Sequence, residues 1–173
     1  MGSAIITYAY NFSLGAPIVR AFAYFIGWLI AVTISGAHFN PATTIAVYLV
    51  ERKYGEHAKY LILAILSQIC GSYLGILISH AIDHKAPLLF FPVENLIYFY
   101  DTKYDDIYFA KIILIETLMT FTFTVIFLLM KYKGTLDSTE QIIKGMALAV
   151  VLIALYGMSH GSGGCYNPAH ALT

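Results

Sequence analysis

The sequence predicts an all-α membrane protein, a helical bundle built as an inverted repeat with two re-entrant half-helices. Of its 173 residues, 59% are hydrophobic and only 12% are charged, whereas about a quarter of an ordinary soluble domain is charged. Several apolar stretches also approach or exceed the roughly 20 residues that a helix needs to cross a bilayer. A soluble helical protein with an unusually apolar core is the alternative, and the length of these stretches disfavours it.

The apolar stretches follow one another along the chain, separated by polar links. The first is short and covers about 3–12. Four more are each long enough for a spanning helix, at about 17–34, 58–82, 107–130 and 141–158. Pro17 suits the first turn of a helix, and Gly15 before it lets the chain reverse. We therefore expect one partial and four full membrane spans.

The charges of the links predict an orientation. Two links are basic, and their residues are Arg52, Lys53, Lys59, Lys131, Lys133 and Lys144. The 83–106 link is mostly acidic and rich in aromatic residues. Basic links favour the cytoplasmic side, so we place the 83–106 link outside, with its Tyr and Phe side chains at the level of the lipid headgroups.

Composition also excludes several classes of partner. The net charge is zero and the charges are scattered, so a nucleic-acid partner is not expected, because it requires clustered Lys and Arg. Cys70 and Cys165 lie far apart and give neither a disulfide framework nor a metal-binding pattern. We expect no cofactor and no metal.

Two segments of the chain repeat the sequence Asn-Pro-Ala. SGAHFNPA covers 35–42 and GGCYNPA covers 163–169, and the two asparagines, Asn40 and Asn167, are 127 residues apart. The predicted spans between them are odd in number, so the copies enter the membrane from opposite sides, as an inverted repeat requires. We divide a single domain, 1–173, into a first repeat at 1–82 and a second at 107–173.

Each Asn-Pro-Ala is typical of a helix start. Asparagine caps a helix through its side chain, and proline at the first helical position has no N–H to lose. After the first motif only about nine residues, Ala42 to Val50, precede a charged segment, which is roughly 13 Å of helix. Such a half-helix is tolerated inside a membrane only where it is buried in protein or lines a wet cavity.

Two half-helices that meet near the midplane would form a pore between their ends. Their positive N-terminal ends would repel cations, including hydronium, and not neutral molecules. Asn40 and Asn167 would donate amide N–H groups to the oxygen of a passing solute, and a water held in this way cannot accept another proton. A single Asn-Pro-Ala is more often an ordinary capped turn, but two inverted copies favour the pore. The pore motif residues are Asn40, Pro41, Ala42, Asn167, Pro168 and Ala169.

These motifs resemble those of the aquaporin and aquaglyceroporin (major intrinsic protein) family, and the resemblance covers most of the chain. It implies a passive channel for water or small neutral solutes such as glycerol, with ions and protons excluded. It also implies a homotetramer with a pore in each subunit, and we expect the protein in the plasma membrane or a vacuolar membrane.

The resemblance assigns roles to polar residues inside the spans. Glu116 matches a buried acid that accepts hydrogen bonds from a re-entrant loop, and we expect it to brace that loop. His38 and Gln68 are the other expected structural braces. A proton relay is the alternative role for Glu116, since acids inside membranes are often functional.

The chain departs from the family at the selectivity filter. The family places an arginine directly after the second Asn-Pro-Ala, where this chain has His170. Spacing puts the other filter positions near Arg20 or Phe22, at Leu155 and at Gly164, and we take Phe22 as the first. The pKa of an unperturbed histidine is near 6.5, so His170 suggests pH-dependent conduction, which permeability of His170→Ala at acid and neutral pH would test.

Compared with the family, the sequence is short. The first span is partial and the sixth is absent, because the chain stops at Thr173. We expect a fragment, an incomplete gene model or a truncated paralogue, and the alternative function is a non-conducting subunit that associates with full-length family members.

Two weak patterns suggest other chemistry. The segment 157–161 matches G-x-S-x-G, but no acid follows it as an esterase would require. His80 and His84 share a helix face without a third metal ligand. We therefore do not expect an enzyme.

Overall fold

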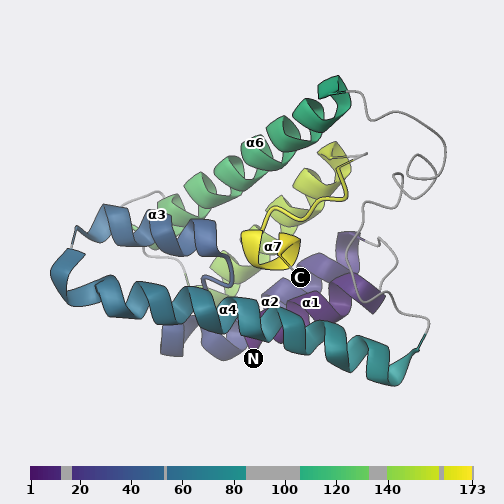
Figure 1. Cartoon of the computed structure of the whole chain (residues 1–173). Helices are drawn as coiled ribbons and strands as arrows, with labels where there is room; N and C mark the ends of the chain where they lie inside the picture. Colours follow the sequence, from purple (N-terminus) through teal and green to yellow (C-terminus); the bar gives the residue numbers. More distant parts are fainter. Residues whose placement is uncertain (13–16, 53, 85–105, 133–139, 160–161, 173) are drawn as a thin grey trace.

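The computed structural model of the chain describes residues 1–12, 17–52, 54–84, 106–132, 140–159 and 162–172. Every regular element in these ranges is a helix (Figure 1), which confirms the all-α prediction. The helices are α1 (Gly2–Phe12), α2 (Pro17–Ser35), α3 (Pro41–Glu51), α4 (Tyr54–Ile82), α6 (Asp106–Lys131), α7 (Gln141–Met158) and α8 (Pro168–Ala171).

Four of these helices are long and apolar enough to cross a membrane, as the hydropathy predicts. The candidate spans are Pro17–Ser35, His57–Ile82, Ala110–Lys131 and Gln141–Met158. The aromatic residues that we expect at the headgroup level belong to the 85–105 segment and lie outside the described residues. Figure 1 shows the short α8 in the middle of the bundle, beside α4.

Helix α1 packs directly against α4 through two glycines spaced four residues apart. A Cβ atom on Gly75 would lie 2.6 Å from the carbonyl oxygen of Ala4, and one on Gly71 would lie 3.1 Å from the Cβ of Ser3. Small residues at this spacing let two helix backbones approach closely inside a membrane. The close contact therefore depends on the absence of side chains at these positions.

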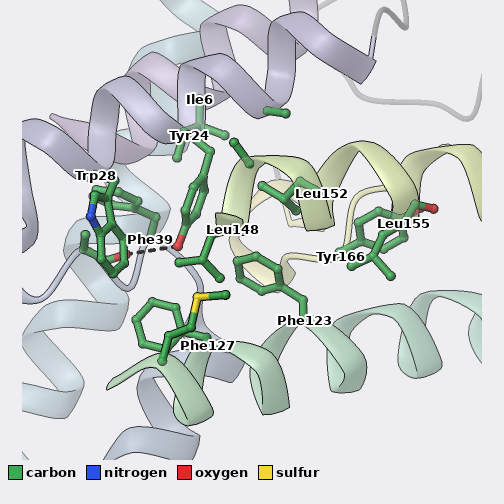
Figure 2. Packing of buried hydrophobic residues seen from close by; sticks show 14 of the residues in the cluster. Ile6, Tyr24, Trp28, Phe39, Phe123, Phe127, Leu148, Leu152, Leu155 and Tyr166 are labelled. Carbon is green, nitrogen blue, oxygen red and sulfur yellow. Dashed lines mark hydrogen bonds between the residues drawn. The ribbon is translucent and has the colours of Figure 1, made fainter. Parts of the chain in front are cut away.

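The main buried cluster joins α2, α6, α7 and the loop before α3 (Figure 2). The Trp28 indole donates its N–H to the carbonyl of Gln141 at 2.8 Å. It also packs edge to face on Phe127, with 5.9 Å between ring centroids. The ring of Tyr24 packs in the same way on Phe39 and Phe123. Phe39 precedes the first asparagine, so this aromatic core holds the loop that carries the motif.

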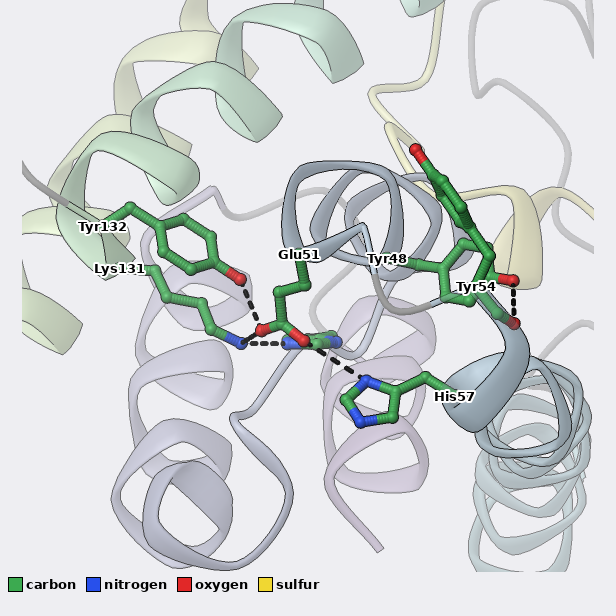
Figure 3. A network of polar contacts seen from close by, with 7 residues as sticks. Tyr48, Glu51, Tyr54, His57, Lys131 and Tyr132 are labelled. Atoms are coloured by element: carbon green, nitrogen blue, oxygen red, sulfur yellow. Dashed lines mark hydrogen bonds and ion pairs between the residues drawn. The ribbon is translucent and has the colours of Figure 1, made fainter.

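A polar cluster joins the end of α3 to the end of α6 and the start of α4 (Figure 3). Glu51 accepts a 2.6 Å hydrogen bond from the Tyr132 hydroxyl, forms an ion pair with Lys131 at 3.6 Å and lies 3.5 Å from the Nδ1 of His57. The hydrogen bond from Tyr132 is the main reason why the pKa of Glu51 lies below its usual value. The cluster anchors the far end of the half-helix α3.

A candidate pore at the two Asn-Pro-Ala motifs

Both motif asparagines cap the helices that follow them. The side-chain oxygen of Asn40 accepts the N–H of Ala42 at 2.9 Å, and that of Asn167 accepts the N–H of Ala169 at 3.0 Å. Both asparagines have extended backbone conformations, and the proline after each begins the helix. The chain therefore starts α3 and α8 in the same way.

The loops before the two asparagines share an unusual backbone. Phe39 and Tyr166, which directly precede them, have φ angles of +49° and +46°. The left-handed region is rare for residues with bulky side chains and is often found at functional sites. Positive φ angles also recur at matched positions 127 residues apart, at Gly36 and Gly163 and at Ala37 and Gly164.

The two motifs are tied together by reciprocal hydrogen bonds. The side-chain nitrogen of Asn40 donates to the carbonyl of Tyr166 at 2.7 Å, and that of Asn167 donates to the carbonyl of Phe39 at 2.8 Å. Each amide thus binds the residue before the other asparagine. An amide nitrogen carries two N–H groups, so each asparagine has a second N–H to offer.

A narrow cavity of about 30 Å³ lies at this junction. This volume is the space open to the centre of a water molecule, and roughly 10–15 Å³ of such space holds one water. The cavity therefore has room for about two waters. Its lining comes from both halves of the chain: Ile6, Tyr24, Phe39, Asn40, Phe123, Leu152, Tyr156, Cys165, Tyr166, Asn167 and His170.

Glu116 of α6 contacts the second loop. Its carboxylate accepts the backbone N–H of Tyr166 at 2.7 Å and that of Cys165 at 3.3 Å. These two N–H groups lie in a partly buried loop without regular structure, where an unsatisfied donor is costly. The geometry is the one that the resemblance implies for a bracing acid.

The other two expected braces act elsewhere. Gln68 of α4 donates to the hydroxyl of Thr44 at 2.8 Å and so links α4 to the first turn of α3. His38 lies in the first loop, with its Nε2 3.2 Å from the Nζ of Lys131. Burial, together with the charge of Lys131, lowers the pKa of His38 to about 4. This histidine is therefore neutral at neutral pH.

The expected filter residues do not all come together. His170 is buried and lines the narrow cavity. Gly164 is buried beside Tyr156 and has a φ of +63°, and Leu155 is buried but is not among the lining residues. Phe22 lies on an outward face of α2 and is 43% exposed. Its side chain points away from the site that spacing assigns to it, because α2 turns its other face to the bundle.

Two aromatic residues near the cavity are not predicted from the sequence, and a charged residue beside it, Arg20, is predicted only as an alternative to Phe22. Tyr24 and Tyr156 line the cavity, and Arg20, only 7% exposed, lies beside Tyr156. The tyrosines are hard to find, since aromatic residues are common in apolar helices. The signal for Arg20 is present, because a charged residue inside an apolar span is by default a candidate functional residue.

The described residues contain no group of three His, Cys, Asp or Glu that could hold a metal ion. His80 and His84 do lie together, with 5.6 Å between ring centroids. Two imidazoles leave a tetrahedral site half filled. The G-x-S-x-G segment includes residues 160 and 161, which lie outside the described ranges.

Comparison with known families agrees with this geometry. The family model described as Major intrinsic protein matches residues 4–173, nearly the whole chain. The chain belongs to the major intrinsic protein family. A comparison with curated proteins found no match. Major intrinsic proteins are membrane channels for water or small solutes and not enzymes, so family membership supports an integral membrane protein with a channel function.

Proposed function

We propose that the chain forms a channel in which water or small neutral solutes such as glycerol pass between Asn40 and Asn167, while ions and protons are excluded. The observation that carries this proposal is the reciprocal bonding of the two capped asparagines beside one narrow cavity. The arrangement fixes both amides in place and leaves each with an N–H for a solute.

Selection against ions is supported by the surroundings of the cavity. Apart from the asparagines and His170, its lining is mainly aromatic and aliphatic. An ion that enters must give up water, and a cavity with room for about two waters supplies few replacements. The N-terminal end of α3, opened by Asn40, adds a positive partial charge that disfavours cations.

Exclusion of protons is supported by the direction of the asparagine donors. Protons travel along water chains in which each oxygen accepts one hydrogen bond and donates another. A water whose oxygen accepts bonds from both Asn40 and Asn167 must direct its two hydrogens outward. The chain of waters is then interrupted at this point.

The test is osmotic shrinkage of vesicles that contain the purified chain, recorded by stopped flow. Serine caps a helix about as well as asparagine, so an Asn40→Ser and Asn167→Ser double variant keeps the caps and loses the amide donors. We expect fast shrinkage for the wild type and for Cys70→Ser, an exposed control on α4, and slow shrinkage for the double variant. Equal rates in all three would contradict the proposal.

A second candidate function is supported by a groove of about 720 Å³ along α6 and α8. Its wall includes the polar side chains of Glu116, Thr117, Thr120 and Ser162. Lipid tails cannot satisfy polar groups, whereas a protein helix can. This favours a subunit that associates with full-length family members and alters their conduction. Co-expression with a full-length channel, followed by co-purification and permeability measurements, would distinguish it from a channel that works by itself.

The assembly and the membrane follow from the resemblance. We propose a homotetramer in the plasma membrane or a vacuolar membrane. Mass determination of the protein in native membrane fragments would test the tetramer, and fluorescent tagging in the source cell would test the location.

A further inference from the structure

Arg20 lies near the start of α2 and is buried against the bundle. Only 7% of its surface is exposed, whereas the neighbouring Val19 and Phe22 are 45% and 43% exposed. An arginine near a helix end usually extends its charged group to the membrane surface. Arg20 does not, so its guanidinium is held inside the protein by other residues.

Two contacts hold the guanidinium to the second re-entrant loop. Its Nη1 donates to the carbonyl of Gly163 at 3.3 Å. Its central carbon lies over the Tyr156 ring, 5.3 Å from the centroid. Tyr156 in turn stacks on Tyr166, with 5.3 Å between centroids and 27° between ring planes. The charge therefore belongs to a stack that ends one residue before Asn167.

The same charge lies beside the wall of the narrow cavity. Tyr156 and His170 both line that cavity together with the two asparagines. The imidazole of His170 is 3% exposed and within the electrostatic influence of Arg20. A fixed positive charge thus lies next to the passage, and it comes from α2 and not from α8.

We propose that Arg20 is the residue that excludes cations from the pore, with Tyr156 and His170 as its partners in the filter. The inference rests on the proposed channel function and deepens it. It assigns to α2 the guanidinium that the resemblance leads us to expect directly after the second Asn-Pro-Ala, where this chain has His170. The solutes that such a filter passes are neutral molecules with oxygen acceptors.

A positive charge fixed beside a narrow passage repels the cations that enter it. A unit charge held behind the wall of a narrow passage acts through protein and not through bulk water, so it lowers the local population of cations on the order of tenfold or more. Neutral solutes are not repelled. The hydrogen bond to Gly163 and the contact with Tyr156 fix the charge, whereas a flexible side chain would leave the passage open.

The experiment compares proton flux with water flux in the same vesicles. A trapped pH-sensitive dye reports proton entry at a clamped membrane potential, and stopped-flow light scattering reports water flow. Arg20→Gln and Arg20→Met remove the charge, and Arg20→Lys keeps it. Lys59→Gln is the matched control, because Lys59 also lies over a tyrosine ring, at 5.1 Å, but is exposed.

We expect the ratio of proton flux to water flux to rise about tenfold or more in Arg20→Gln and Arg20→Met. It stays at the wild-type value in Arg20→Lys and Lys59→Gln. A double variant, Arg20→Gln with His170→Arg, places a guanidinium in the same gap from the other side and lowers the ratio again.

Different results would contradict the proposed channel and the proposed role of Arg20. Wild-type vesicles without asparagine-dependent water flow would contradict the channel itself. Asparagine-dependent water flow with an unchanged ratio in both charge-free variants would overturn the role of Arg20 alone. A double variant that leaks protons as fast as Arg20→Gln would also overturn it, because a restored guanidinium would then fail to block protons.

Discussion

Each motif asparagine uses one amide group for several contacts. The oxygen of Asn40 caps α3, and its nitrogen binds the loop before Asn167. Asn167 does the same for α8 and the loop before Asn40. No other side chain of this size offers one acceptor and two donors. Serine or aspartate would cap the helix but would leave the opposite carbonyl without its donor.

At the residue scale, the first prediction concerns Glu116. Glu116→Ala leaves the N–H groups of Cys165 and Tyr166 without their acceptor. We expect a loss of roughly 3 kcal/mol in the free energy of unfolding, because both bonds go to a charged group. Water permeability should fall as well, since the loop positions Asn167. Thermal unfolding in detergent measures the first effect and stopped flow the second.

The control is Glu140→Ala, which removes an exposed acid that makes no side-chain capping bond. It should leave stability and permeability close to those of the wild type. A Glu116→Ala variant as stable as this control would show that the carboxylate does not brace the loop.

The second prediction concerns the pH dependence of stability at His38. Its pKa in the folded protein is about 4, lowered mainly by burial and then by Lys131, against the raising effect of Glu51. The unfolded chain has the ordinary histidine pKa near 6.5, so it binds more protons between these two values. The free energy of unfolding therefore falls as the pH falls through this window and levels off below about 4.

His38→Asn removes this titration. Unfolding temperatures measured from pH 7 to pH 4 should fall less in the variant than in the wild type. Parallel curves for the two proteins would mean that His38 titrates normally in the folded state.

The motif residues can be predicted from the sequence, but the face that each neighbouring helix turns toward them cannot. Asn40 and Asn167 can be predicted because two inverted copies of Asn-Pro-Ala favour a pore over an ordinary capped turn, and Glu116 because the resemblance implies a bracing acid at its position. The choice between Arg20 and Phe22 cannot be made from spacing, since the two are only two residues apart on α2. The packing of α2 decides it, with Phe22 turned outward and Arg20 buried.

At the scale of elements, α3 is a half-helix fixed at both ends. Its 11 residues extend about 16 Å, which is half of the bilayer core. Asn40 holds its start to the second loop, and Glu51 holds its end to Tyr132 after α6. A helix this short has little stability of its own, so these contacts determine its position.

The prediction at this scale concerns the contact between α2 and α7. A Cβ atom on Gly145 would collide with the Trp28 indole. Gly145→Val should destabilise the protein by roughly 2–3 kcal/mol, as expected for overpacking of a filled site. Detergent unfolding measures the effect.

Gly157→Ala is the matched control in the same helix, because a Cβ atom there meets nothing within 4 Å. It should be neutral or slightly stabilising, since alanine favours helix. Equal stability of the two variants would show that Trp28 does not pack tightly on α7.

Hydropathy predicts the four long helices to within a few residues, because a span must be long and apolar. It does not predict how they pack. The spanning helices are apolar on all sides, so a periodic pattern does not separate the inner face from the lipid face. The contact of α1 with α4 therefore emerges only from the structure, although Gly71 and Gly75 are visible in the sequence.

At the scale of the whole molecule, the two Asn-Pro-Ala motifs, one from each half of the chain, meet at one junction. The residues before each asparagine accept hydrogen bonds from the other asparagine, and the cavity at this junction draws its lining from both halves. A change in one motif should therefore disturb the other, and the two asparagine substitutions should not be additive, as expected for groups in one network.

We propose that this junction conducts water while it blocks protons. The most direct measurement records water flow and the decay of a pH gradient together in vesicles with the wild-type chain. We predict that the vesicles shrink much faster than protein-free vesicles and hold the pH gradient equally long. Shrinkage at the protein-free rate, or fast shrinkage with a rapid loss of the gradient, would contradict the claim.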